Sequence, residues 1–190
     1  MSDIRTKWDN KWQEKAGQPC EPDEWLLKVR DLLPPGKALD VACGQGRNSL
    51  YLAEQGMTVT AIDLSGEALE QLRNKAAAYN LDIRTCRIDL EADPRLPGEE
   101  PFDLITIFFY LHRPLLPLLR DAVRPGGIMV MRSLSSAGPF PGGPGNPDFV
   151  LHPGELLEVF ADWEILLHEE GLEPSRRGGS VAGIVARRPL

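Results

Sequence analysis

A loop with two glycines lies between a predicted strand and a predicted helix, in the segment ALDVACGQG from Ala38 to Gly46. Glycines let the backbone turn sharply and approach a ligand without an intervening Cβ. The first turn of the helix that follows offers N–H groups with no partner inside the helix. Turn glycines at strand ends are common, so the loop is interpreted together with the acidic residues around it.

Three acidic residues accompany this loop. Asp63 ends the second predicted strand, 17 residues after Gly46, where a carboxylate can accept both hydroxyls of a ribose. Asp40 lies four residues before Gly44; an acid there would repel a pyrophosphate but suits a ligand with an ammonium group. Asp89 ends the third strand, where it can accept the amino group of adenine. Together they predict a nucleoside ligand that carries an ammonium group.

Two other nucleotide sites fit the loop poorly. Ser49 stands where the dinucleotide fingerprint has its third small residue, and Asp40 opposes a pyrophosphate, so a nicotinamide-dependent dehydrogenase is the least favoured enzyme class. The glycines are not followed by Gly-Lys-Ser or Gly-Lys-Thr, which excludes a P-loop.

Short strands that alternate with helices position these residues. The predicted strands are residues 38–42, 58–62, 83–88, 102–108, 128–132, 163–168 and 181–186, and the predicted helices are 47–55, a helix capped by Ser65, 115–123 and 153–160. This alternation predicts an α/β fold: a Rossmann-like, doubly wound, seven-stranded and mostly parallel sheet. The two closing strands have no helix between them and predict an antiparallel hairpin over 163–187.

The composition fits one domain over residues 1–190. The formal net charge of −7 disfavours a nucleic-acid partner. The longest apolar run, residues 104–111, is too short for a membrane span. The polar first residues hold no signal-peptide core, and three scattered cysteines suit a reduced cytoplasm. We therefore expect a cytoplasmic protein with no membrane or nucleic-acid partner and no metal, and the oligomeric state stays open.

Glycine and proline are in surplus, at 35 of 190 residues, and ten of them fall within residues 138–154. This segment follows the fifth strand, whose end is expected to face the ligand. We therefore predict a substrate-side loop at 138–154. Residues 1–35 hold Trp8, Trp12 and Trp25 and are predicted to form an N-terminal helical lid on a cofactor-binding core over 36–133.

Five segments in order resemble the motifs of class I S-adenosylmethionine-dependent methyltransferases: DVACGQG, AIDLS, RIDLE, FDLITI and RPGGIMVM. Within that superfamily, CGQGRNSLYLAEQG, PDFVLHPGELLEVFADWEI and the opening WDNKW resemble the tellurite-resistance and thiopurine-type small-molecule methyltransferases. One segment departs from the pattern. The closing hairpin turn, EEGLEPSRRGG, has arginines but lacks the histidine of the group's His–Arg pair.

The resemblance implies S-adenosylmethionine as cofactor and S-adenosylhomocysteine as product. The methionine part would be held by Asp40 and the backbone near Ala42 and Gly44, within the glycine motif that includes Gly46. The ribose would be held by Asp63, with Leu64 against the adenine, and the base by Asp89 and the backbone of Leu90. The backbone of Phe108 would lie near the methyl group.

On the acceptor side, Tyr110 and His112 follow the fourth strand and are candidate catalytic residues. Trp12, Arg47, Arg113 and Arg132 are candidate substrate residues. Each has a competing structural interpretation: Trp12 as a core anchor or lid, His112 as a helix cap, and Arg132 as a salt-bridge partner.

These observations predict a methyltransferase that acts on a small molecule by in-line displacement, with a chalcogen oxyanion, a thiol or a similar nucleophile as acceptor. Methyl transfer of this kind depends mainly on alignment of the reactants and exclusion of water. The alternatives are a methyltransferase for protein or RNA and a non-catalytic S-adenosylmethionine-binding module.

Overall fold

The computed structural model describes residues 2–98, 100–176 and 178–190, with side chains from residue 4 onward. The strands are β1 (Lys37–Val41), β2 (Thr58–Asp63), β3 (Ile83–Arg87), β4 (Phe102–Phe108), β5 (Val123–Ser135), β6 (Glu164–Pro174) and β7 (Ser180–Arg187). The α-helices are α1 (Ser2–Gln13), α2 (Glu24–Lys28), α3 (Arg47–Glu54), α4 (Gly66–Ala78), α5 (Leu116–Ala122) and α6 (Glu155–Val159). Short 3-10 turns lie at η1 (Arg30–Leu32), η2 (Arg113–Leu115) and η3 (Pro147–Phe149).

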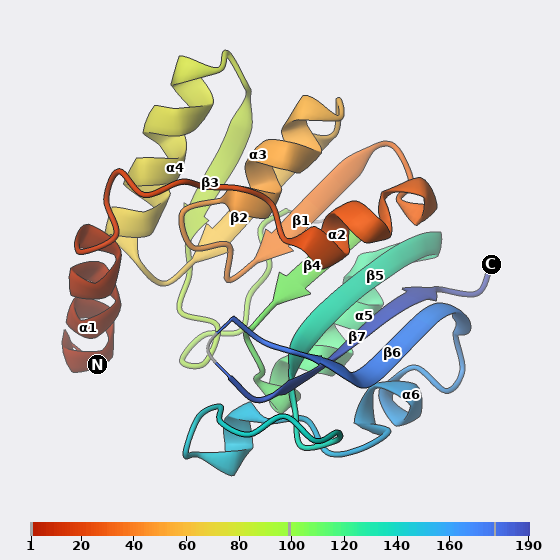
Figure 1. The fold of residues 1–190 in the computed structure, drawn as a ribbon. Helices are drawn as coiled ribbons and strands as arrows, with labels where there is room; N and C mark the ends of the chain where they lie inside the picture. The colour runs from red at the N-terminus through yellow and green to blue at the C-terminus, as the bar shows by residue number, and fades with distance from the viewer. Residues whose placement is uncertain (1, 99, 177) are drawn as a thin grey trace.

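These strands form one seven-stranded sheet in the order β3-β2-β1-β4-β5-β7-β6 (Figure 1). The first five pair in parallel, and β7 pairs antiparallel with both β5 and β6. The predicted fold class is therefore confirmed. The strand order reverses between β1 and β4, and the carboxyl ends of strands at such a switch point are where open α/β sheets bind ligands.

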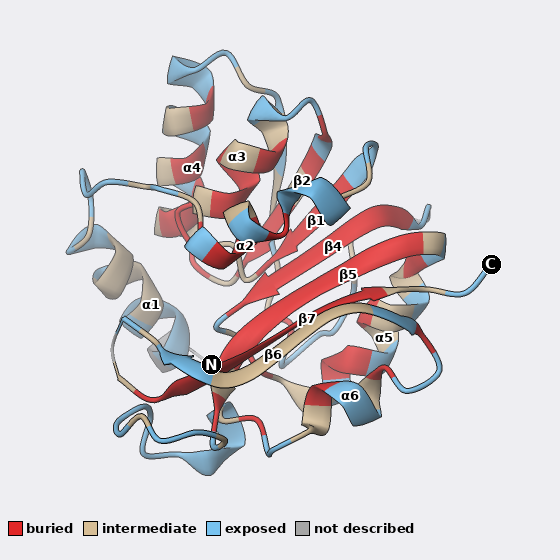
Figure 2. Cartoon of the chain, turned by 45° about the vertical axis from the view of Figure 1, so that its right-hand side comes forward, coloured by how far each residue is buried: buried red, intermediate tan, exposed pale blue. Residues whose placement is uncertain are grey.

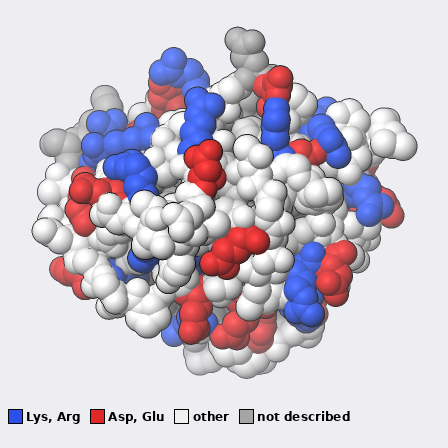
Figure 3. All heavy atoms as spheres, turned by 90° about the horizontal axis from the view of Figure 1, so that it is seen from above, with Lys and Arg blue, Asp and Glu red and all other residues white. Residues whose placement is uncertain are grey.

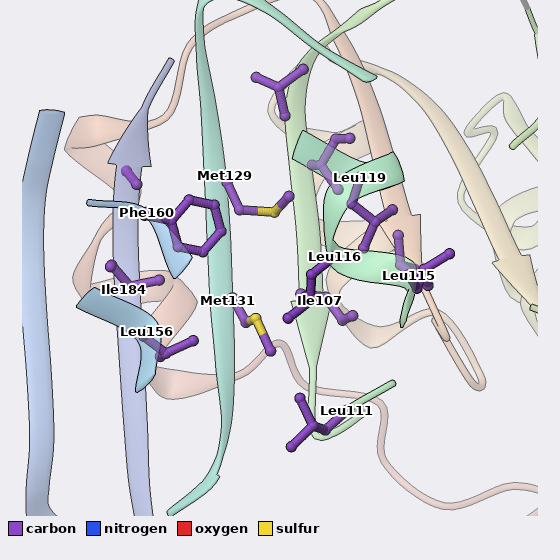
Figure 4. Packing of buried hydrophobic residues seen from close by; sticks show 14 of the residues in the cluster. Ile107, Leu111, Leu115, Leu116, Leu119, Met129, Met131, Leu156, Phe160 and Ile184 are labelled. Carbon is purple, nitrogen blue, oxygen red and sulfur yellow. The ribbon is translucent and has the colours of Figure 1, made fainter. Parts of the chain in front are cut away.

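Helices cover both faces of the sheet, because most of its central residues are apolar and buried. One face packs on α5 and α6, and the other packs on α2 and α3. The strands β4, β5 and β7 are buried through most of their length, whereas the edge strand β6 is only half-buried (Figure 2). On the first face, Leu156 of α6 and Phe160, the C-cap of that helix, lie beside Met129 and Met131 of β5 (Figure 4).

The start of β5 differs from the prediction. The sequence predicts a strand at 128–132, because Arg124-Pro125-Gly126-Gly127 is a turn signal, but β5 begins at Val123. Val123 pairs with Phe102 and Ile128 pairs with Leu104, so four residues of β5 bulge out opposite a single residue of β4. Gly126 absorbs the bend with a φ of +76°, and the pairing resumes because both flanking residues are buried.

Gly138, Gly142 and Gly143 pack backbone to backbone against glycines of the β6–β7 hairpin. A Cβ on Gly138 would lie 2.6 Å from the Cα of Gly171, and a Cβ on Gly179 would lie 2.9 Å from the carbonyl oxygen of Gly142. The N–H of Gly179 also donates to the carbonyl of Pro141 at 2.8 Å. The expected loop thus owes part of its glycine surplus to close contact with the hairpin, where a side chain would not fit.

Among the described residues, every helix is too short or too polar to cross a membrane. On the face drawn in Figure 3, basic and acidic side chains are interspersed and do not gather into a single basic patch.

Candidate cofactor and acceptor site

The glycine loop leaves β1 in the left-handed region of backbone space and enters α3. Gly44 has a φ of +56° and Gly46 a φ of +76°, which glycine adopts at little cost. A Cβ on Gly44 would lie 2.6 Å from the indole of Trp12, and a Cβ on Gly46 would lie 2.2 Å from Leu72 of α4. Both glycines are therefore required, one by the N-terminal segment and one by the packing of α3 against α4.

Ala42 also has a positive φ, of +53°, although it carries a Cβ. A non-glycine residue in this region costs about 1–2 kcal/mol, so we expect Ala42→Gly to raise the free energy of unfolding by up to about 1 kcal/mol despite the greater freedom it gives the unfolded chain. Chemical denaturation checks this. The matched control is Ala77→Gly, on the exposed face of α4, which we expect to lower the stability by about 0.5–1 kcal/mol. Equal losses in both variants would contradict strain at Ala42.

The Asp63 carboxylate bridges the glycine loop and the start of α4. One oxygen accepts the N–H of Gly44 and the other the N–H of Ser65, each at 2.8 Å. A carboxylate offers about four lone-pair positions, so these two bonds leave capacity for two hydroxyl donors. Burial raises the pKa of Asp63 above its usual value, against the lowering effect of the two N–H donors.

Asp40 lies deeper, with only 2% of its surface exposed. Its two oxygens accept the hydroxyl of Ser49 at 2.5 Å and the hydroxyl of Thr106 at 2.9 Å. Burial raises its pKa to about 6, although these bonds and the nearby Arg47 act in the opposite direction. Asp40 is therefore placed to act on a cationic ligand through its charge, because both oxygens are already bonded inside the protein.

The third acidic position begins a turn after β3. Asp89 accepts the N–H of Ala92 at 3.1 Å, and Arg5 of α1 lies 3.8 Å from its other oxygen. Leu90 is buried in the core, and the carbonyl of Leu64 accepts the Arg87 side chain at 3.0 Å. These residues line the same sheet edge as Asp63, because β2 and β3 pair in parallel.

Two arginines meet across the end of β4. Asp23, the N-cap of α2, accepts Arg47 at 2.7 Å on one oxygen and Arg132 at 2.7 Å on the other. Arg132 is buried and is also paired with Glu173 of β6. The ring of Phe109, which has a φ of +56° and is 41% exposed, lies 5.9 Å from each guanidinium.

The residues on either side of Phe109 lie differently. Phe108 is buried and packs edge-on against Trp25 at 6.5 Å. Tyr110 is partly buried against the core; burial, with the charges of Glu91, Asp89 and Asp63, raises its pKa far above the usual value. Its phenol therefore stays protonated at neutral pH, where it can donate a hydrogen bond but is a poor general base.

His112 and Arg113 follow at the start of η2. His112 occupies the N-cap position of η2, where its backbone carbonyl accepts the N–H of Leu115 at 2.9 Å, but its side chain makes no capping hydrogen bond. The Arg113 guanidinium binds Glu155 at 2.7 and 2.8 Å and the carbonyls of Asp148 and Val150 at 2.9 Å. Arg113 thus holds the 138–154 segment against the end of β4, and a contact of its side chain with the acceptor stays a prediction.

Sequence reasoning missed two residues of this site. Asp23 precedes a helical stretch, which signals an N-cap, but nothing in its neighbourhood indicates that Arg47 and Arg132 converge on it from 24 and 109 residues away. Phe109 carries no local signal for a left-handed backbone, since bulky residues rarely adopt one.

Residues 12–178 match the family model described as Tellurite resistance protein TehB. The chain is similar to the probable S-adenosyl-L-methionine-dependent methyltransferase TehB of Haemophilus influenzae, at 31% identity over 77% of this chain and 52% of the relative. It therefore spans about half the length of that protein. It is also similar to an uncharacterized methyltransferase of Synechocystis, at 30% identity over 81% of this chain and 76% of the relative.

Two solved structures share the fold. The crystal structure of TehB from Haemophilus influenzae aligns with a TM-score of 0.77 and 24% identity, over 95% of this chain and 67% of that one. A Burkholderia thailandensis 1,6-didemethyltoxoflavin-N1-methyltransferase, solved with 1,6-didemethyltoxoflavin and S-adenosylhomocysteine, aligns with a TM-score of 0.70 and 21% identity, over 100% of this chain and 87% of that one.

Proposed function

The chain belongs to the TehB family of S-adenosylmethionine-dependent methyltransferases, and on that basis we propose that it transfers a methyl group from S-adenosylmethionine to a small-molecule acceptor. The observation that carries the proposal is the Asp63 carboxylate. It is buried between Gly44 and Ser65 and has lone pairs left for two ligand hydroxyls. The neighbouring loop reaches this position because Gly44 and Gly46 adopt a positive φ and pack against Trp12 and Leu72.

The residues at this edge suit each part of the cofactor. Asp40 would supply a buried negative charge toward the ammonium group, Asp63 would accept the ribose hydroxyls, and Asp89 with the backbone of Leu90 would hold the base. Leu64 would pack on the adenine, and the backbone at Phe108 would lie near the methyl group. When bound, S-adenosylmethionine supplies a methyl group attached to a positively charged sulfur. Transfer of the methyl group releases the neutral thioether S-adenosylhomocysteine, a leaving group that needs no metal.

The acceptor side carries two positive groups and an exposed ring. Arg47 and Arg132 flank Phe109, but Asp23 and Glu173 offset their charges. The preference for an acceptor with negative charge, such as a chalcogen oxyanion or a thiolate, therefore rests on membership of the TehB family. Arg132 also lines a hollow of about 130 Å³ between α2 and the β6–β7 hairpin, together with Lys28, Glu169 and Glu173. Tyr110 remains a hydrogen-bond donor and His112 a candidate acid or base for acceptors that require one.

Calorimetry with S-adenosylhomocysteine tests the cofactor site, and a screen of selenite, tellurite, thiols and halides, read by release of S-adenosylhomocysteine, tests the reaction. We expect binding of the product and turnover of at least one anionic or thiol acceptor. Failure of S-adenosylhomocysteine to bind at high micromolar concentration would refute the proposal.

Tight binding without turnover across the panel would instead favour a non-catalytic module. Turnover on protein or RNA alone would favour the macromolecular alternative, which the net charge of −7 opposes. Within the described residues all three cysteines are unpaired, which supports the cytoplasm as the proposed location.

A further inference from the structure

Helix α1 lies along the edge that holds the proposed cofactor residues. Arg5, Asp9 and Trp12 are spaced four and three residues apart and so share one face of the helix. Arg5 lies 3.8 Å from Asp89, Asp9 contacts the start of α4, and the indole of Trp12 lies against Gly44. This one face therefore reaches the positions assigned to the base, the ribose and the methionine part. Figure 1 shows α1 standing beside α4 at this end of the sheet.

Asp9 makes the polar contact at the centre of that face. Its Oδ1 accepts the hydroxyl of Ser65 at 2.6 Å and the N–H of Glu67 at 3.2 Å, and Arg87 lies 3.5 Å from its other oxygen. Ser65 in turn donates its own N–H to Asp63. Asp9 is thus one residue removed from the carboxylate assigned to the ribose.

The environment keeps Asp9 ionised. Burial acts to raise its pKa, but the bonds from Ser65 and Glu67 and the charge of Arg87 outweigh it, so the pKa is lowered. A negative charge at this point also interacts favourably with the N-terminus of the 13-residue helix α4.

Two glutamines hold the other end of α1. The side-chain amide of Gln71 donates to the carbonyl of Trp12 at 2.9 Å, and that of Gln45 donates to the carbonyl of Lys15 at 3.2 Å. Gln45 belongs to the glycine loop and Gln71 to α4, so α1 is attached to the same two elements that Asp63 bridges.

We propose that Asp9 is a positioning residue: it ties α1 to Ser65 and so couples docking of α1 to retention of the cofactor at Asp63. The inference rests on the proposed function, since it concerns the same cofactor. A cofactor that contacts Asp63, Asp89 and the glycine loop lies under the face of α1, so its dissociation requires α1 to separate from Ser65. Loss of the Asp9 contact then shortens the residence time of the cofactor more than it slows its association.

Stopped-flow tryptophan fluorescence measures the dissociation rate of S-adenosylhomocysteine from the full chain. We expect Asp9→Ala to raise that rate about tenfold, as for loss of a hydrogen bond to a charged group, and Asp9→Asn to raise it less, because its amide oxygen still accepts from Ser65. The control Glu14→Gln removes the same formal charge from an exposed residue just after α1 and should stay within about twofold of the wild type.

Hydrogen exchange gives a second measurement that does not depend on turnover. S-adenosylhomocysteine should protect the amides of residues 4–13 in the wild type and protect them less in Asp9→Ala. Binding by the wild type with an unchanged dissociation rate in both Asp9 variants would overturn this inference and leave the proposed function intact. Absence of binding by the wild type itself would refute the proposed function and this inference with it.

Discussion

Replacing Asp40 with asparagine is expected to raise the free energy of unfolding at pH 7 by about 1–3 kcal/mol while weakening cofactor binding. Burial raises the pKa of Asp40 from 3.8 to about 6, so the folded protein holds an ionised group that the unfolded chain ionises more readily. This difference in pKa between the folded and unfolded states lowers the free energy of unfolding by about 3 kcal/mol at pH 7. Asparagine fills the same space without the charge, and the hydroxyls of Ser49 and Thr106 can reorient to bond it.

The pH dependence gives the sign of this effect. The pKa of Asp40 is higher in the folded state, about 6, than in the unfolded chain, where it is near 3.8. Its contribution to stability is therefore fully present below pH 3.8 and is lost as the pH rises through about 6. The difference in unfolding free energy between Asp40→Asn and the wild type should therefore be largest near neutral pH and shrink toward pH 4. Denaturation series at several pH values measure it, and other titrating groups cancel in the difference. A gap that widens on acidification would disprove the assignment.

The same substitution removes the negative charge assigned to the ammonium group of the cofactor. Charges several ångströms apart in a partly screened interior interact by about 1–2 kcal/mol, so we expect the affinity for S-adenosylhomocysteine to fall roughly tenfold. If Asp40→Asn is more stable than the wild type but binds S-adenosylhomocysteine less tightly, the charge of Asp40 serves binding and not the stability of the fold. Calorimetry at pH 7 on both proteins provides the comparison.

Replacing Asp63 with alanine is expected to reduce the affinity for S-adenosylhomocysteine by about 1–3 kcal/mol, or roughly 5- to 150-fold. The change removes the acceptor for the ribose hydroxyls and leaves the N–H groups of Gly44 and Ser65 without their partner. Because the fold also loses these bonds, calorimetry should be accompanied by thermal unfolding to establish the folded fraction.

Two further variants sharpen the result. Asp63→Asn keeps one acceptor oxygen and should lose less affinity than alanine, whereas Asp82→Ala removes an exposed acid before β3 and should leave binding unchanged. Wild-type affinity in folded Asp63→Ala would remove this residue from the proposed site and with it the main support for the ligand assignment.

Local patterns predicted most of the fold. Strands such as β2 and β4 are short, apolar and bounded by polar or turn residues, so their character depends on neighbours in the sequence. Ser65 caps α4 as predicted, accepting the N–H of Ala68 at 3.2 Å, because capping also involves residues only a few positions apart. The start of β5 was misplaced, because the pairing of Val123 with Phe102 across the sheet outweighed the local turn signal.

Some residues of the candidate site could likewise be predicted from local patterns, whereas others depend on long-range contacts. Asp40, Asp63 and Asp89 each lie at or near the end of a predicted strand, and parallel pairing brings such ends to one edge. The arginine pair on Asp23 joins residues 24 and 109 positions apart, and the contact of Asp9 with Ser65 spans 56. Such contacts depend on how whole elements pack, which local spacing does not encode.

The sequence by itself therefore determined the order of the elements and the sheet edge along which the three acids lie, since these follow from periodicity and from which strand each residue ends. Only the tertiary structure decided what each side chain does there. In the structure, Arg113 binds the 138–154 segment, and Arg47 and Arg132 both bind Asp23. Both oxygens of Asp40 accept hydrogen bonds from the protein, and α1 lies along the sheet edge that holds the three acids. The physical reason is that hydrogen bonds and ion pairs form between groups that meet in space, and burial then sets which of them stay charged.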